Sequence, residues 1–246
     1  QAAYEPSTYR RWTRIMSGGP HSTAAKIRRQ RLRRSNYLEI GKWINEQLKD
    51  HGVWVVLMPR AQFDSEFLKG IEHSPDWRLI FVNNKQKMYV DVTTEEGMKL
   101  FNGILSGDTI YPDEFSKNLT FAHNLLLYGQ NKATRLHSLD YAIKAFELLP
   151  SQSSIEQVLK VDARISAARP RVRKICREYV EDFHKNLDSY LKQDGFDHKM
   201  AAAMISCNYL GNMAYNDNKR ALSQKYREIK QQLAGILSEM RDKKRW

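Results

Sequence analysis

The chain has 246 residues, enough for one large domain or for a core with an appendage. Its composition is 41% hydrophobic, and it has no apolar run of about eighteen residues, so we expect no membrane-spanning helix. The formal net charge is +12, with nine Lys and Arg against one acid in residues 1–36 and nine against three in residues 218–246. Basic residues concentrated at the two ends predict that one or both ends bind a polyanion.

The first 36 residues are rich in Arg and Ser and nearly free of acids, as in a mitochondrial presequence or in an RNA-binding extension. We expect the extension, because a cleaved presequence would not remain in the mature chain, although an upstream presequence is compatible with it. Residues 1–25 show no sustained period, which predicts an arm that orders only on a partner, or else an ordinary disordered tail. The composition of residues 24–34 favours a highly charged helix lying in water or against nucleic acid.

The arginines of this extension are candidate RNA-binding residues. Rings at Tyr4, Tyr9 and Trp12 interleave with the first of these arginines, and such rings can stack on bases beside charges that meet phosphate. The candidates are Arg10, Arg11, Arg14, Arg28, Arg29, Arg31, Arg33 and Arg34.

A small α/β module is expected next. The apolar runs 53–58 and 77–82 are typical of strands buried on both faces, and apolar residues at helical spacing predict a helix over 60–73. Two buried strands joined by a helix form a βαβ unit, whose faces need covering helices. We expect one such helix at 37–50 and a third strand at 107–111.

The rest of the chain is predicted to be helical, apart from residues 133–141, which are ambiguous between an edge strand and an irregular loop. The predicted fold class is α/β: a small mixed sheet built on a βαβ unit with covering helices, followed by an all-helical C-terminal extension. The expected domains are a basic RNA-binding arm at 1–36, an α/β core at 37–165 and a helical extension at 166–246.

The last predicted helix, from Asp217 to about Asp242, has a regular apolar seam. Its members are spaced 4, 3, 4, 3, 4, as at the a and d positions of a coiled coil. Either the helix folds back on the apolar stripe of residues 172–191, or it projects and binds another protein, which would bury side chains contributing about 1.5–3 kcal/mol each. The candidate partner-binding residues are Leu222, Tyr226, Ile229, Leu233, Ile236 and Met240.

No motif in the sequence predicts an enzyme. It has no GxxxxGK[ST], GxGxxG, HExxH or GxSxG, and its seven histidines are scattered singly. The acidic pair Glu95 and Glu96 falls at a predicted helix start, where the helix dipole accounts for it. Cys176 and Cys207 are far apart and predict two reduced, packed thiols without a disulfide or zinc site. We therefore expect no catalytic residue, no metal and no cofactor.

The basic N-terminal stretch and the order helix, strand, helix, strand up to residue 85 resemble the ribosomal stalk-base protein family of the large subunit. At the end of the second strand, Val82 and Asn84 match the family's Val-Lys-Asn-Thr-like signature, whereas Asn83 and Lys85 depart from it.

Later segments are also similar to this family. Leu105–Tyr111 stands where the family has a Gly-Pro-Thr strand, and a helix like that at 113–128 follows. Leu148–Ser151 and then Ile155–Leu159 are similar to the family's Leu-Pro-Ser segment and helix. The likeness covers about residues 37–165, and it is the order and spacing of the segments together that support it.

The resemblance implies that the core binds ribosomal RNA at the base of the stalk, with Asn84 and Lys85 among the contacts. It also implies that the C-terminal helix receives the N-terminal domains of the stalk dimers. About fifty residues of the region 170–246 have no counterpart in the family, and such additions, with a long basic arm, indicate a mitochondrial rather than a cytoplasmic ribosome. The expected partners are ribosomal RNA and other large-subunit ribosomal proteins including the stalk dimers, without a membrane.

Two other functions stay open. A viral nucleocapsid-type protein, exchanging its basic arm and C-terminal helix between protomers around RNA, would form concentration-dependent homo-oligomers. A nucleic-acid-processing enzyme, whose acidic residues converge only in the fold, would show nuclease activity dependent on a divalent metal. In each case the RNA affinity should fall steeply with salt.

Overall fold

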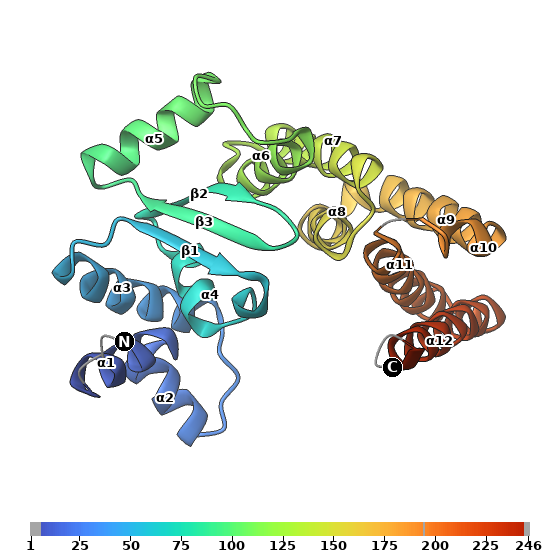
Figure 1. The fold of residues 1–246 in the computed structure, drawn as a ribbon, viewed down its shortest axis with the longest axis horizontal. Helices are drawn as coiled ribbons and strands as arrows, with labels where there is room; N and C mark the ends of the chain where they lie inside the picture. Colours follow the sequence, from blue (N-terminus) through green and yellow to red (C-terminus); the bar gives the residue numbers. More distant parts are fainter. Residues whose placement is uncertain (1–5, 194, 244–246) are drawn as a thin grey trace. The chain divides into compact units, whose positions relative to one another are not determined.

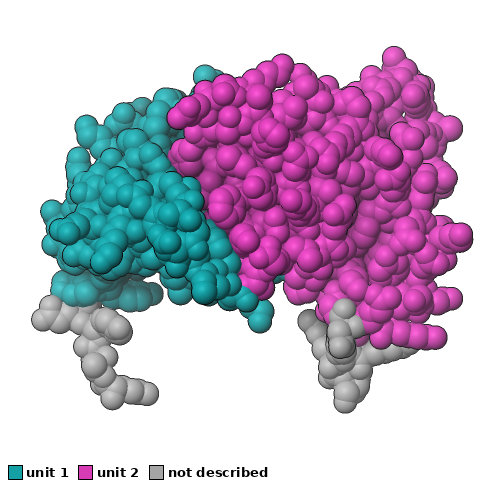
Figure 2. Space-filling view, turned by 90° about the horizontal axis from the view of Figure 1, so that it is seen from above, with its two compact units in different colours: residues 1–112 teal, residues 113–246 magenta. Residues whose placement is uncertain are grey.

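The computed structural model describes residues 6–193 and 195–243. The chain divides into two compact units, residues 1–112 and 113–246, which Figure 2 colours separately and which are described one at a time below. The boundary between the units falls inside the predicted core of residues 37–165, so neither expected domain boundary coincides with it.

Unit 1 is a three-stranded sheet between helices (Figure 1). Strand β3 lies between β1 and β2 and is antiparallel to both, so β1 and β2 run parallel to each other without being neighbours. Helix α4 connects them, which makes a split βαβ unit and confirms the predicted small α/β module. The elements are α1 (Pro6–Met16), α2 (Gly19–Ile27), α3 (Arg34–Asp50), β1 (Val55–Pro59), η1 (Arg60–Gln62), α4 (Glu66–His73), β2 (Trp77–Val82), β3 (Gln86–Asp91) and α5 (Glu95–Ser106).

Different helices cover the two faces of the sheet. Figure 1 shows α3 and α4 on one face and α5 on the other. On the α5 face, Ile80, Val90 and Ile104 form a buried apolar cluster. On the opposite face, the ring nitrogen of Trp77 donates to Asn45 of α3 at 2.9 Å. Strand β1 is an edge strand, and Leu57 is 51% exposed, so the prediction that this strand is buried on both faces is wrong.

The third strand lies at residues 86–91, and the prediction of a strand at 107–111 is wrong. Asn83 closes the β2–β3 hairpin, because its side-chain oxygen accepts the N–H groups two and three residues later at 2.8 and 2.9 Å. The strand escaped notice because one of its inward positions holds Lys87. This lysine is 6% exposed, and its ammonium pairs with Glu72 at 2.6 Å.

The N-terminal region is folded against unit 1, so the expected arm over residues 1–25 is wrong where the structure describes it; residues 1–5 lie outside the described residues. Ile15 of α1 is fully buried. Gly19 starts α2 at φ +66 and lies against Trp43, and a Cβ there would meet the indole ring at 2.3 Å. Close packing of this kind shows why apolar contacts with α3, rather than a local period, determine the structure of the segment.

Unit 2 is helical throughout its described residues. The ambiguous residues 133–141 lie inside α7, which Asn131 caps by accepting the N–H of Thr134 at 2.9 Å. The elements of this unit are α6 (Glu114–Tyr128), α7 (Lys132–Leu148), α8 (Gln152–Arg164), η2 (Ser166–Ala168), α9 (Arg169–Lys185), α10 (Leu187–Tyr190), α11 (Phe196–Asn216) and α12 (Arg220–Lys243). The predicted helical extension is confirmed, although the helical unit begins about fifty residues earlier than expected.

One continuous apolar core runs through unit 2, and α11 is central to it because it packs against α8, α9 and α12. Ala202 and Ala203 are fully buried, and Gly211 lies close to α12. Small side chains at these positions let the helices approach one another closely. In both units, none of the helices formed by the described residues has the length and apolar character to cross a bilayer.

Candidate nucleic-acid interface

Residues 28–34, here called the arginine segment, connect α2 to α3 and begin with a tight helix stop. The N–H of Gln30 donates to the carbonyl of Ala25 at 2.9 Å, and the N–H of Arg29 donates to Lys26 at 3.1 Å. These two bonds form a Schellman motif, whose left-handed position is usually a glycine. Here Arg29 occupies it with φ +51. An arginine is thus kept in a backbone conformation that costs about 1 kcal/mol for residues with a Cβ.

The arginine segment is also held at its other end. The N–H of Arg33 donates to the side-chain oxygen of Asn36 at 2.9 Å, and the carbonyl of Arg33 accepts the first bond of α3, from Tyr37 at 3.1 Å. The chain reverses between α2 and α3, which pack against each other. The predicted helix over residues 24–34 is therefore wrong beyond Ile27.

The arginine segment displays its charges to solvent. Five of its seven residues are arginines, and all five are exposed. Within the described part of the chain, none of the five guanidinium groups has a hydrogen-bond, ion-pair or ring partner. The ion pair closest in sequence is Lys26 with Glu66 of α4, at 3.4 Å. Free guanidinium groups at this density suit the phosphates of a nucleic acid, which arginine binds through two parallel hydrogen bonds.

A second group of arginines lies on α1, where Arg10, Arg11 and Arg14 are all exposed. Arg11 reaches Asp50 at 3.8 Å, but both side chains are about half exposed, so this ion pair is weak. Arg14 lies over the Trp43 ring, 5.8 Å from its centroid. These arginines are therefore accessible to an anionic ligand, although Arg11 and Arg14 have contacts within the chain.

Of the predicted stacking rings, Tyr9 is 69% exposed and can stack on a base. Trp12 is used within the fold, because its ring lies 5.5 Å from that of His51. Tyr4 lies outside the described residues. Of the predicted interleaved rings in the described residues, the structure therefore leaves Tyr9 beside the α1 arginines available for stacking.

The two arginine groups do not merge. Helix α1 contacts the second half of α3 through Trp43, Asp50 and His51, whereas the arginine segment leads into the first residue of α3. Seventeen helical residues span about 25 Å at 1.5 Å per residue. The candidate interface therefore consists of two cationic clusters, one at the start of α3 and one along its second half.

The predicted contacts Asn84 and Lys85 lie in the β2–β3 turn. Lys85 is exposed, and its carbonyl accepts the N–H of Arg60 at 2.7 Å, which ties the turn to the end of β1. Asn84 is half-buried. Sequence analysis missed Arg60, whose guanidinium carbon lies 4.9 Å from the centroid of the Phe63 ring and beside this turn.

The apolar seam of α12 is largely used inside unit 2. Tyr226, Ile229 and Leu233 are buried in the core, and Ile236 and Met240 pack against it half-buried. Only Leu222, at 38% exposure, stands largely outside. The structure therefore favours the fold-back interpretation, but the main contact is α11 rather than residues 172–191.

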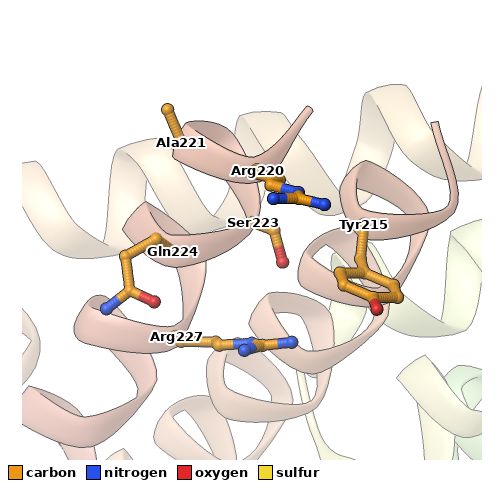
Figure 3. Close-up of a pocket in the computed structure, with 6 residues that line it drawn as sticks. All are labelled: Tyr215, Arg220, Ala221, Ser223, Gln224 and Arg227. Atoms are coloured by element: carbon orange, nitrogen blue, oxygen red, sulfur yellow. The ribbon is translucent and has the colours of Figure 1, made fainter. Parts of the chain in front are cut away.

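Sequence analysis also missed a hollow of about 380 Å³ between the end of α11 and the start of α12 (Figure 3). The apolar seam does not indicate this hollow, because the lining residues of α12 come from another side of that helix. The spacing i, i+3, i+4, i+7 of four polar residues would have indicated it. The lining residues are Tyr215, Arg220, Ala221, Ser223, Gln224 and Arg227.

The reactive groups of unit 2 have structural roles. Burial raises the pKa of both Cys176 and Cys207 to about 12, so both thiols are protonated and unreactive near neutral pH. The buried carboxylate of Asp162 accepts bonds from Arg169 at 3.1 Å and from the Tyr209 hydroxyl at 3.0 Å. Across the described residues, no three His, Cys, Asp or Glu side chains converge as ligands for a metal ion.

Comparisons of the chain with known protein families, with curated proteins and with solved structures find no match. The resemblance to the stalk-base family is thus supported by the sequence segments alone. One of those segments, residues 107–111, forms no strand.

Proposed function

We propose that this protein is a non-catalytic RNA-binding protein that contacts the phosphate backbone through its arginine segment. The observation that supports the proposal is the set of five exposed guanidinium groups within seven residues, none of which is neutralised by an acid of the described chain. Neutralising phosphates releases counterions, and this release drives binding. Because the backbone of the segment is bonded at both ends, little ordering is needed when RNA binds.

The arginines of α1 supply a second contact to the same strand. Along α3, Trp43 beneath Arg14 lies about 14 Å from Arg34, and Asp50 beside Arg11 lies about 24 Å from it, which corresponds to about four to seven nucleotides of a stacked strand at 3.4 Å each. Tyr9 offers a ring for a base at the α1 end. Two fixed cationic clusters would favour an RNA element of matching length over a shorter one.

Within this function, we propose a structural role at the stalk base of the large ribosomal subunit, in a mitochondrial ribosome. The support is the resemblance over residues 37–165 together with the two cationic clusters. Ribosomal RNA, other large-subunit proteins and the stalk dimers are the proposed partners. Dimers that bind the seam of α12 must displace it from α11 and expose Tyr226, Ile229 and Leu233, at a cost of about 1.5–3 kcal/mol for each.

Removing the charge of the arginine segment tests the RNA-binding proposal. In the segment variant, the arginines at 28, 29, 31, 33 and 34 become Gln. A matched lysine variant loses five scattered, exposed charges instead, at Lys99, Lys132, Lys185, Lys192 and Lys225. The measurement is RNA affinity between 50 and about 300 mM salt, by fluorescence anisotropy with a single-stranded RNA.

We expect the segment variant to lower the slope of log affinity against log salt by about 3.5, since each of the five lost phosphate contacts on a single strand removes about 0.7. The lysine variant should change the slope by less than about 1. Equal slopes for the two variants would mean that net charge alone attracts RNA and that the arginine segment is no binding site.

Purification of the tagged protein from cells, followed by sedimentation and mass spectrometry, tests the ribosomal proposal. We expect large-subunit ribosomal proteins and an acidic stalk protein to co-sediment with it. Recovery of only the protein itself with heterogeneous RNA would refute the ribosomal role and leave the RNA-binding function in place. Deleting residues 218–246 would not test stalk binding cleanly, because the deletion would uncover the core of unit 2.

A further inference from the structure

The hollow between α11 and α12 begins at a tight turn. Helix α11 ends at Asn216, and α12 starts four residues later at Arg220. The N–H of Lys219 donates to Ala214 at 2.8 Å, and the N–H of Asn218 donates to Tyr215 at 3.0 Å. These bonds occupy two of the last carbonyl groups of α11, which would otherwise repel an anion beside the start of α12.

Ser223 provides an unused hydrogen-bond donor in the wall of this hollow. The residue is 3% exposed, and its hydroxyl oxygen has no hydrogen-bond partner among the described residues. Figure 3 shows the hydroxyl pointing into the space between Arg220 and Tyr215. A buried hydroxyl without a partner lowers stability, and a ligand in the hollow that accepts its hydrogen bond would remove this cost.

Two arginines supply positive charge from the same side of α12. Arg220 and Arg227 are seven residues apart, which is two helical turns, and both are exposed. Neither has an ion pair within the described chain, and Arg227 lies 5.9 Å from the centroid of the Tyr215 ring. The first turn of α12 contains no acid, so the positive end of the helix dipole adds to their charge.

The two nearby acidic side chains, Asp217 and Glu228, already have partners within the unit. Asp217 in the turn pairs with Arg173 at 2.8 Å. Glu228 on α12 accepts a hydrogen bond from Gln224 at 3.0 Å. The hollow is therefore positive on balance, with a hydroxyl donor at its wall and an aromatic ring at its rim.

We propose that this hollow binds the phosphate group of a nucleotide. Arg220 and Arg227 contact the phosphate oxygens, and the Ser223 hydroxyl donates to one of them. The Tyr215 ring, 60% exposed, stacks on the base. A space of about 380 Å³ is at the small end of ligand sites and suits a single nucleotide. A free nucleotide and one nucleotide of an RNA strand share this chemistry, and the site does not depend on RNA binding at the arginine segment.

The test uses the full chain in the form of the segment variant, so that RNA binding at unit 1 does not contribute. Inorganic phosphate, uridine monophosphate and a hexauridylate without a terminal phosphate are titrated by calorimetry. The substitutions are Arg220→Gln, Arg227→Gln, Ser223→Ala and Tyr215→Leu. Lys225→Gln is the matched control, because it removes one charge of α12 about 140° around the helix from Arg220.

We expect each arginine substitution to weaken nucleotide binding by about tenfold or more, and Ser223→Ala by about fivefold. Lys225→Gln should change the affinity by less than about twofold. Tyr215→Leu should weaken uridine monophosphate but not inorganic phosphate, since only the nucleotide has a base to stack. Binding of the hexauridylate identifies an RNA strand as the source of the phosphate, and binding of the monophosphate alone identifies a free nucleotide.

Affinities that the two arginine substitutions leave unchanged would overturn the proposal. Inorganic phosphate that binds as tightly as uridine monophosphate would overturn the assignment of a nucleotide. Folding of each variant is checked by alkylation of Cys176 and Cys207, which are buried in the same unit and become reactive only when it opens.

Discussion

The two basic ends of the chain contain nine Lys and Arg residues each but have different structural roles. The N-terminal end folds into α1 and α2 and still leaves the charges of its arginine segment exposed. The C-terminal end folds as α12, and its apolar seam is buried against α11. The sequence predicted a polyanion site at one or both ends, and it left open whether the C-terminal helix folds back or projects. The N-terminal end keeps the predicted arginines on the surface, whereas the C-terminal end buries most of its predicted seam and exposes cations such as Arg220 and Arg227.

The same contrast appears between two runs of arginines. Arg169, Arg171 and Arg173 alternate along the start of α9, much as arginines crowd the arginine segment. All three have acidic partners, which are Asp162, Asp140 and Asp217 respectively. Burial raises the pKa of Asp140, but the hydrogen bonds and charges of Arg171 and His137 outweigh it, so the pKa is lowered on balance. A run of arginines in a sequence therefore indicates a polyanion site only where the fold places no carboxylates against it.

The sharpest test of the comparison between the two ends is Leu233→Ala. Leu233 is 1% exposed in the core of unit 2, so we expect the free energy of unfolding of this unit to fall by about 2–5 kcal/mol. Leu222→Ala, on the same seam but 38% exposed, should change it by less than about 0.5 kcal/mol. Equal small effects would mean that the seam is not packed in the free protein and is available to a partner.

Two probes separate the units in this experiment. The cysteines lie in unit 2, and because burial raises the pKa of each to about 12, their alkylation reports the opening of that unit. Four of the five tryptophans lie in unit 1, so tryptophan fluorescence mainly reports the other. Leu233→Ala should speed alkylation and leave the fluorescence transition of unit 1 in place.

A smaller effect on stability is expected from replacing one arginine of each run by alanine. Arg169→Ala leaves the buried carboxylate of Asp162 with the hydroxyl of Tyr209 as its donor, and should cost unit 2 about 1–2 kcal/mol. We expect the lower part of the range for such a loss, because 44% of the Arg169 side chain is exposed and solvent screens it. Arg31→Ala should leave stability within about 0.5 kcal/mol but weaken RNA binding. If both substitutions reduced RNA affinity equally, ion pairing would not distinguish the two runs.

How far the sequence predicts the fold depends on whether the signal is local. The apolar run of β2 and the caps of helices such as α6 and α8 are local, and these elements were predicted near their places, whereas the first half of α7 was not. The strand β3 was not predicted, because its buried Lys87 is stabilised by an ion pair with Glu72, fifteen residues earlier. Helix α1 and the first half of α2 were missed for the same reason, since contacts with Trp43 of α3 stabilise them.

The candidate sites follow the same rule. The arginines at 28–34 were identified from composition, but their freedom from acids depends on neighbours that only the fold brings close. The seam of α12 was recognised from its spacing, whereas the identity of its partner, α11, was not encoded in that spacing. The hollow beside Ser223 was missed because its lining combines one face of α12 with Tyr215 of another helix.

The smallest expected effect tests the backbone of the arginine segment. Arg29 has φ +51 at the left-handed position of the Schellman motif. Arg29→Gly should therefore raise the stability of unit 1 by about 0.5–1 kcal/mol, whereas Arg29→Ala, which keeps a Cβ, should leave it nearly unchanged. Both remove the same charge, so both should lower the slope of log RNA affinity against log salt by about 0.7.

These two substitutions at position 29 separate the conformation of the segment from its charge. Tryptophan fluorescence during urea unfolding gives the stability of unit 1, and anisotropy across salt concentrations gives the slope. A stabilised glycine variant that binds RNA as weakly as the alanine variant would mean that the guanidinium, and not the strained backbone, is what RNA recognises at this position. A glycine variant that loses far more affinity than the alanine variant would show instead that RNA binding depends on the fixed backbone conformation of the segment. Glycine gives the backbone at position 29 more conformational freedom than alanine does.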